Sequence, residues 1–403
     1  MSPKKEQFLE EGFRWFGPAD PVPLAFIRQS GAESVFTSLH EIPYGAPWPE
    51  AAVAARRRLV ENAGLRWAAV ESVPVSEAVR TRSGPFARHI ENYRATLRAL
   101  AAQGVRLVIY NFMPVLDWIR TDLRFRLPDG SACLRYDPAQ FAAFEIGLLK
   151  RPGAERDYTP DQLARARAFL ASLNESRRAA FERSIIDVFP GCSLGLGLPD
   201  IRRMIDAYRD ITPDGLREHL RLFLQAVAPV AQECGLRLAI HPDDPPFPVL
   251  GLPRIASNLS DFLKILSWHD GDANGVCFCT GSLGASPDND LPAMLDALAH
   301  RVFVAHLRST QREPGGAFHE SGHLEGSVPM FAIVRRLLAL QHQRLAAGGP
   351  RLLFRPDHGR DMADDLDKPP PPNPGYAFIG RMKGLAELRG LQAGILGSQS
   401  AAA

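Results

Sequence analysis

Short apolar runs alternate along this chain with longer amphipathic segments. Eight of the runs have the length and composition of buried strands, although the first is weak. They are Phe13–Gly17, Ser34–His40, Trp67–Val73, Val105–Phe112, Leu236–His241, Val276–Thr280, Val302–Leu307 and Leu352–Asp357. Most intervening segments repeat apolar residues at helical spacing, among them Arg88–Gln103, Leu216–Cys234, Leu259–Trp268, Leu291–Ala299 and Phe331–Ala347. Strands and helices in this order predict an α/β (β/α)₈ TIM barrel, with a doubly wound open sheet as the alternative.

Two regions interrupt the alternation. Residues 113–210 hold no convincing strand, so we expect a helical insertion after the fourth strand that caps the mouth of the barrel. Its predicted elements are helices at Ala139–Leu149, Pro160–Leu173 and Glu175–Ile186, and a glycine-rich turn at Gly191–Gly197. Near the other end, residues 367–374 include a stiff four-proline linker that leads to a last helix at Arg381–Leu391. We expect residues 1–403 to form a single catalytic domain.

Composition narrows the class of protein. A formal net charge of +2 on 403 residues offers no strong field for nucleic acid or a membrane surface. No run of about 18 apolar residues is present, so no transmembrane helix is expected. The first residues lack the apolar segment of a signal peptide, and five cysteines without a scaffold-like spacing suit a reducing compartment. We therefore expect a cytoplasmic protein without nucleic-acid or membrane partners.

Four of the predicted strands end in side chains that bind metals. They deliver His241, Cys279, His306 and Asp357. Because the carboxyl ends of parallel barrel strands converge on one mouth, we expect these side chains to meet. Two imidazoles, a thiolate and a carboxylate form a complete ligand set for a divalent transition metal, whereas any one of these histidines alone is more often structural. Cys277 points the same way as Cys279 but lies deeper in the strand, so we expect it in the barrel interior.

Other polar residues at the strand ends suggest roles around such a metal. Arg308 and Arg355 share a strand face with the ligand candidates, and either can clamp a carboxylate or pair with a neighbouring loop. Asn111, at the end of the fourth strand, can bind a hydroxyl. His358 directly follows a ligand candidate and is placed to transfer a proton. Tyr376, after the proline linker, can enter the same pocket from a loop.

A competing motif lies at His319–His323, which matches H-E-x-x-H, the signature of zinc proteases. That motif works only on a helix, where both imidazoles face one metal. Gly322 lies inside the motif, and neighbouring glycines and prolines disfavour a regular helix here. We therefore expect a loop, in which His319 and Glu320 can lie over the active site. A P-loop, a dinucleotide-binding glycine motif and a serine-hydrolase elbow are missing, which disfavours nucleotide roles.

Several longer motifs resemble those of the mannonate dehydratase family, in the right order from about residue 13 to 390. They begin at Arg14 (RWFGP), Glu71 (ESVP), Tyr110 (YNFMPVLDW), His241 (HPDDPP), Cys279 (CTGS), His306 (HLRST), Arg355 (RPDHG) and Asn373 (NPGY). The resemblance implies a TIM barrel of the xylose-isomerase-like type and dehydration of D-mannonate to 2-keto-3-deoxy-D-gluconate in glucuronate catabolism.

The resemblance also implies site roles and a cofactor. By position, His241, Cys279, His306 and Asp357 would bind one Mn²⁺ or Fe²⁺, with catalysis by His358 and Tyr376. The ligand types alone would suit Zn²⁺ equally well. A metal-dependent sugar isomerase or epimerase on the same barrel, and a non-catalytic sugar-acid-binding protein, are the alternative functions. A homo-oligomer is expected for a barrel of this kind.

Overall fold

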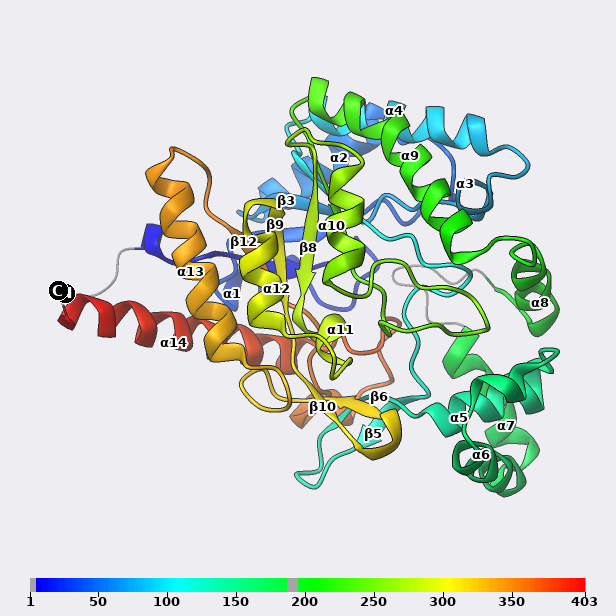
Figure 1. Ribbon diagram of the computed structural model, residues 1–403. Coiled ribbons are helices and arrows are strands. Elements are labelled where there is room, and N and C mark those ends of the chain that lie inside the picture. Colours follow the sequence, from blue (N-terminus) through cyan, green and yellow to red (C-terminus); the bar gives the residue numbers. More distant parts are fainter. Residues whose placement is uncertain (1–4, 187–194, 403) are drawn as a thin grey trace.

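Eight parallel strands close into a barrel in the computed structural model, which describes residues 5–186 and 195–402 (Figure 1). In chain order the strands are β1 (Glu10–Arg14), β2 (Ser34–Thr37), β3 (Arg66–Glu71), β4 (Leu107–Tyr110), β7 (Arg237–Ile240), β8 (Asn274–Cys279), β9 (Val302–Leu307) and β12 (Leu353–Pro356). Neighbours follow chain order, and β12 pairs with β1 to close the ring. The predicted TIM barrel is confirmed, and the open sheet is wrong.

Helices surround the barrel between these strands. The longer ones are α2 (Glu50–Asn62), α4 (Phe86–Ala102), α9 (Pro213–Glu233), α10 (Leu259–Ser267), α12 (Leu291–Leu298), α13 (Met330–Ala346) and α14 (Phe378–Ala402). The five helices predicted between strands are confirmed to within a few residues, because each buries one apolar stripe. In α4 that stripe is Ile90, Tyr93, Leu97 and Leu100. Among the described residues, no helix combines the length and apolarity needed to cross a membrane.

The first barrel strand begins earlier than its apolar run. We predicted Phe13–Gly17, whereas β1 spans Glu10–Arg14. The difference arises because Glu11, a charged residue, occupies a buried position of the strand. Only 5% of it is exposed, and its carboxylate pairs with Arg389 on α14. An ion pair between distant residues leaves no periodic signal in the sequence.

The segment after β4 contains strands that were not predicted. Its elements are β5 (Asp122–Arg126), β6 (Ala132–Tyr136), α5 (Pro138–Ala143), the π-helical η2 (Phe144–Leu149), α6 (Pro160–Ser172), α7 (Glu175–Ile186) and α8 (Leu198–Asp206). The three predicted helices are present, but the absence of strands was wrong. A Pro128-Asp-Gly130 turn joins β5 to β6, and this turn signal was overlooked because β5 is half exposed and rich in charge. The glycine-rich turn falls largely on residues 187–194, outside the described residues.

A second sheet ties this insertion to the barrel. β5 and β6 pair with β10 (Thr310–Arg312) and β11 (Phe318–Glu320), which lie between β9 and α13, in the antiparallel order β10-β11-β6-β5. Residues more than 180 positions apart thereby become neighbours, as His319 pairs with Arg135. Figure 1 shows β5, β6 and β10 at one end of the molecule, with α5, α6 and α7 gathered on the side away from α14.

Small and aromatic side chains fill the barrel interior. Phe36, Ala69, Ile109 and Val304 belong to this cluster, and Cys277 lies among them, fully buried, as predicted. A much larger apolar cluster packs between the strands and the surrounding helices. The interior below the strand ends is therefore apolar and packed, and the polar side chains that could act on a substrate lie at the mouth.

Gly275→Ala should test how tightly β8 is held. A Cβ at this position would lie 2.5 Å from the backbone oxygen of Arg301 and would overlap the Phe303 ring. Because the backbone of Arg301 cannot shift without strain, we expect the free energy of unfolding, measured with urea, to fall by about 1–3 kcal/mol. The control is Gly390→Ala in α14, where no atom lies within 4 Å of the added methyl group, and a gain of about 0.5–1 kcal/mol is expected. Equal stability of the two variants would contradict the packing argument.

Candidate active site

Three of the predicted ligands meet at the mouth of the barrel. His241 directly follows β7, Cys279 is the last residue of β8, and His306 lies near the end of β9. These strands are neighbours in the barrel, so their ends stand side by side. One donor atom from each residue lies within 4.8 Å of the other two. The group has the donor types and the closeness that a divalent metal requires.

The surroundings of each donor fit metal binding. Nδ1 of His241 donates a hydrogen bond to the carbonyl of Pro242 (2.7 Å), which leaves the lone pair of a neutral ring on Nε2. The Cys279 sulfur lies 3.1 Å from the hydroxyl of Ser282, which can donate a hydrogen bond to it. His306 is fully buried, and its Nε2 makes no close hydrogen bond among the described residues but lies 3.4 Å from Oε2 of Glu71. Such a long contact leaves room for a stronger partner at this nitrogen.

Asp357, the fourth predicted ligand, lies outside that three-residue group but beside it. It directly follows β12, and its Oδ2 is 3.5 Å from the sulfur of Cys279. Burial alone would raise the pKa of this carboxyl, but the adjacent Arg355 and His358 charges and that of Arg308 hold it well below its usual range. Asp357 is therefore an anion next to the cluster, and its role as a ligand stays a prediction.

Arg355 is held by protein carboxylates. It binds Glu71 at the end of β3 through two hydrogen bonds of 2.6 and 2.9 Å, and its third nitrogen lies 2.6 Å from Asp357. Burial opposes ionisation of Glu71, yet Arg355 and His306 hold the pKa of its carboxyl well below its usual range. This arrangement fixes Arg355 at the mouth with its charge balanced. Its predicted contact with a substrate carboxylate is not tested by this geometry.

Arg308 belongs to a second buried ion network. Its Nη2 donates to Asp244 (2.7 Å), which also receives two hydrogen bonds from Arg120 (2.8 and 3.1 Å). Burial would raise the pKa of Asp244, but the two guanidiniums lower it below its ordinary value. All three side chains are at least 97% buried, so the network holds Arg308 in one place.

The two candidate catalytic residues are also brought together. Nε2 of His358 lies 3.2 Å from the hydroxyl of Tyr376, and the two rings meet edge to face. Nδ1 of the same imidazole lies 2.5 Å from Oε1 of Glu320 and 2.7 Å from Nη1 of Arg308. Burial and the nearby Asp357 charge raise the pKa of Tyr376, so its hydroxyl is protonated and can donate.

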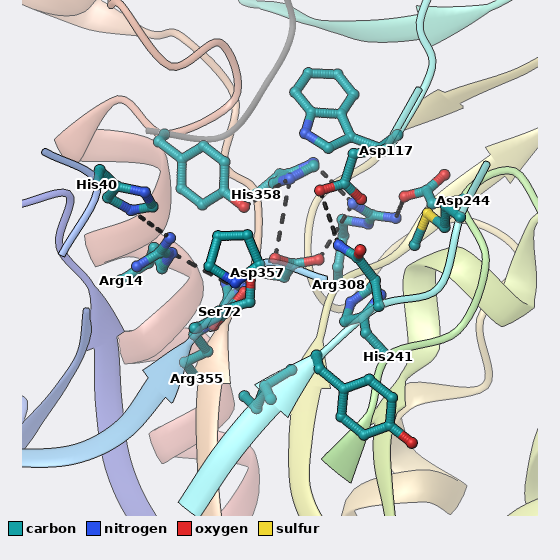
Figure 2. Close-up of a pocket in the computed structure, with 18 of the residues that line it drawn as sticks. Arg14, His40, Ser72, Asp117, His241, Asp244, Arg308, Arg355, Asp357 and His358 are labelled. Atoms are coloured by element: carbon teal, nitrogen blue, oxygen red, sulfur yellow. Dashed lines mark hydrogen bonds and ion pairs between the residues drawn. The ribbon is translucent and has the colours of Figure 1, made fainter. Parts of the chain in front are cut away.

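A polar cavity opens at this point. Its lining includes three arginines, four carboxylates and three histidines, a composition suited to an anion that also carries hydroxyl groups. The predicted substrate-binding residues Asn111, Arg308 and Arg355 all line it, and the amide of Asn111 donates to Asp117 (2.9 Å). Figure 2 shows Arg14 and His40 on the opposite side of this site from His241 and Asp244.

The H-E-x-x-H match does not form a zinc-protease site. His319 and Glu320 lie on β11, and the nitrogen of His319 pairs with Glu313 (2.8 Å). His323 packs its ring against Gly384 on α14, and burial lowers its pKa to about 4. Without a helix the two imidazoles do not face one metal, so the protease alternative is wrong. We expected this segment to lie over the active site. Within it, Glu320 does contact the site, through His358.

Several charged residues of the site were given no role from the sequence, among them Glu71, Arg120, Asp244 and Glu320. Glu71 and Asp244 stand within the family-like motifs ESVP and HPDDPP, and this placement was the available signal. Arg120 and Glu320 lie in segments that looked like cap and loop, where a charged residue is ordinarily solvated. Only the fold shows that both are buried.

Together, the barrel and the cluster at its mouth define a TIM-barrel enzyme with a candidate site for a divalent metal. The likeness in fold extends to a xylose isomerase-like TIM barrel protein from Mycobacterium smegmatis in complex with magnesium, with a TM-score of 0.51 at 12% identity over 98% of this chain and 100% of that one. At such an identity the likeness concerns the fold alone.

The particular family follows from closer relatives. The family model for D-mannonate dehydratase matches residues 9–401, so the chain belongs to this family, whose members are hydro-lyases. It is 51% identical over 388 residues to the mannonate dehydratase of Chromohalobacter salexigens and 47% identical over 389 residues to that of Marinomonas sp.; each alignment covers 96% of this chain and 99% of the relative. The crystal structure of mannonate dehydratase from Streptococcus suis serotype2 has a TM-score of 0.77 at 29% identity, covering 97% of this chain and 96% of that one.

Proposed function

We propose that this chain eliminates water from D-mannonate to give 2-keto-3-deoxy-D-gluconate, in the glucuronate branch of hexuronate catabolism. The observation that carries the proposal is the convergence of His241, Cys279 and His306 with the His358–Tyr376 pair. The family membership indicates the reaction. The cavity is polar and lined by side chains of both charges, which suits a hydroxylated carboxylic acid.

The proposed cofactor is one Mn²⁺ or Fe²⁺. His241, Cys279, His306 and Asp357 would hold it, the first three because their donor atoms already lie close together and Asp357 because its carboxylate adjoins the sulfur. When bound, a divalent metal supplies Lewis-acid stabilisation of negative charge developing on the substrate. The donor set also suits Zn²⁺, and divalent affinity rises from Mn²⁺ towards Zn²⁺, so the resemblance to the family is what favours Mn²⁺ or Fe²⁺.

The elimination needs a base and an acid on one substrate. The C2 proton is only weakly acidic, so a base must take it while negative charge develops towards the carboxylate. We assign the two proton transfers to His358 and Tyr376: one takes the proton from C2, and the other protonates the departing C3 hydroxyl. The C2–H and C3–O bonds break, the C2–C3 double bond forms, and the enol then becomes the 2-keto acid.

Other cavity residues would orient the substrate. Arg308 and Arg355 would contact the carboxylate, because both line the cavity and are held there by protein carboxylates. The amide of Asn111 would bind a hydroxyl, in place of part of its contact with Asp117. We further propose a cytoplasmic homo-oligomer, for which light scattering on the purified enzyme would give the subunit number.

Turnover of D-mannonate tests the proposal directly. Purified enzyme with added Mn²⁺, or with Fe²⁺ under anaerobic conditions, should give a product lighter by one water that reacts as a 2-keto-3-deoxy acid. An isomerase or epimerase would give a product of unchanged mass, and a sugar-acid-binding protein would give none; the family match does not favour either. Absence of product with metal bound would contradict the proposed substrate. Metal analysis of active protein that shows stoichiometric zinc would contradict the proposed cofactor.

A further inference from the structure

The carboxylate of Glu320 contacts the candidate catalytic residue His358 at Nδ1, the ring nitrogen that does not contact Tyr376. Glu320 is the last residue of β11 and only 2% exposed, and its Oε1 lies 2.5 Å from Nδ1 of His358. The same oxygen lies 3.3 Å from a nitrogen of Arg120 and 3.4 Å from one of Arg308. A buried carboxylate beside two guanidiniums and an imidazole is fixed in position and is surrounded by donors.

The Glu320 carboxylate favours one direction for its hydrogen bond with His358. Burial alone would raise the pKa of Glu320, but its cationic surroundings, the permanent charges of Arg308 and Arg120 among them, lower it below its ordinary value, so the group is an anion. An ionised carboxylate can only accept, hence in this bond Nδ1 of His358 carries the proton. Nη1 of Arg308 lies 2.7 Å from the same Nδ1 and, as a donor, competes for the opposite tautomer, but Oε1 of Glu320 is the closer neighbour of Nδ1, and Nη1 has a carboxylate acceptor in Asp357 (3.2 Å).

We propose that Glu320 is a positioning residue, whose carboxylate keeps the proton of His358 on Nδ1 so that Nε2 presents its lone pair to the Tyr376 hydroxyl and the cavity. This inference rests on the proposed roles of His358 and Tyr376. A neutral imidazole exists in two tautomers, and only one of them offers an acceptor at Nε2. Glu320 selects that tautomer and also fixes the plane of the ring.

The support for Glu320 comes from the second sheet. β11 pairs with β10 on one side and with β6 of the insertion on the other, and Phe318 faces Tyr136 across the second pair. Arg120, which precedes β5, lies with its guanidinium 5.0 Å from the centre of the Phe318 ring. Glu320 is therefore placed by strand pairing, and the glutamate of the H-E-x-x-H match acts on a histidine elsewhere in the chain.

Two substitutions separate the acceptor from the charge. Glu320→Met keeps the shape but removes the acceptor, and we expect kcat on D-mannonate to fall about 10–100-fold, the range typical of residues that orient a functional side chain, with KM and metal content unchanged. Glu320→Gln keeps a carbonyl oxygen, which the two guanidiniums hold at the Oε1 position, so kcat should stay within about fivefold of wild type. Glu313→Gln is the matched control on the same hairpin, outside the cavity lining, and it should leave kcat unchanged.

The tautomer itself can be observed. In ¹⁵N-labelled protein loaded with diamagnetic Zn²⁺, the imidazole signals of His358, assigned by their loss in His358→Ala, should show the proton on Nδ1 in wild type and Glu320→Gln. In Glu320→Met the Nδ1–H population should fall. A wild-type proton on Nε2, or a Glu320→Met variant with wild-type kcat and tautomer, would overturn the inference. If Glu320→Met fails to fold, the wild-type and Glu320→Gln spectra decide. Failure of the proposed function is distinct, because wild type would then give no product whatever the tautomer.

Discussion

Replacement of Cys279 by alanine should strip the metal from the enzyme and abolish turnover. The sulfur is one of the three donors that lie within 4.8 Å of one another, and Cys279→Ala leaves only two of them. Loss of a residue that merely orients a metal ligand costs about 10–100-fold in metal affinity or activity, so loss of the ligand itself should exceed that range. Elemental analysis after dialysis against a weak chelator, together with the D-mannonate assay, measures both effects.

Cys277→Ala is the matched control for that experiment. Cys277 lies two residues earlier on the same strand, fully buried in the interior cluster of the barrel. It should cost some packing energy but leave metal content and turnover near wild type. A Cys279→Ala enzyme that retains one metal per chain would contradict the assignment of the sulfur as a ligand.

Replacement of His358 by alanine should separate catalysis from metal binding. Because a general acid or base contributes about 10²–10⁴-fold, kcat of His358→Ala should fall by that factor. His358 is next to Asp357 in sequence, yet its Nε2 faces Tyr376 and its Nδ1 faces Glu320. The metal content should therefore stay at the wild-type level, in contrast to Cys279→Ala.

Two outcomes would contradict this assignment. Loss of metal from His358→Ala would make the histidine part of the metal site, and a kcat within a few-fold of wild type would remove it from the proton transfers. Tyr376→Phe provides the companion measurement, since it removes only the hydroxyl that lies 3.2 Å from Nε2. Its kcat should fall as well, again with the metal retained.

The barrel was predictable because its signals are local. Most of the barrel strands are short apolar runs, and the helices predicted between them carry an apolar stripe, so period and length distinguish them. The candidate ligands were predictable for a related reason: a TIM barrel brings all strand ends to one mouth, so His241, Cys279 and His306 could be grouped without knowledge of any distance. In the structure their donor atoms lie within 4.8 Å of one another, as this grouping predicts.

The ion networks behind the site were not predictable in this way. Asp244 and Arg120 are 124 positions apart, and Glu320 and His358 are 38 apart, in segments without a shared period. A charged residue in a sequence gives no sign that it is buried, because burial depends on a partner supplied by another element. The same reason explains β5, whose charges hide a strand within the insertion predicted to be helical.

The pairing of β6 with β11 has a consequence for how such enzymes diversify. An insertion after β4 that only covered the mouth could be replaced by another one, and the change would affect which substrates enter but not the reaction itself. Here the insertion supplies Arg120 and the strand beside Glu320, so it also supports His358, the proposed proton-transfer residue. In a chimera that receives residues 113–210 from a distant relative, other side chains would hold this histidine in place. We therefore expect a change of insertion to alter the reaction rate as well as the substrate range.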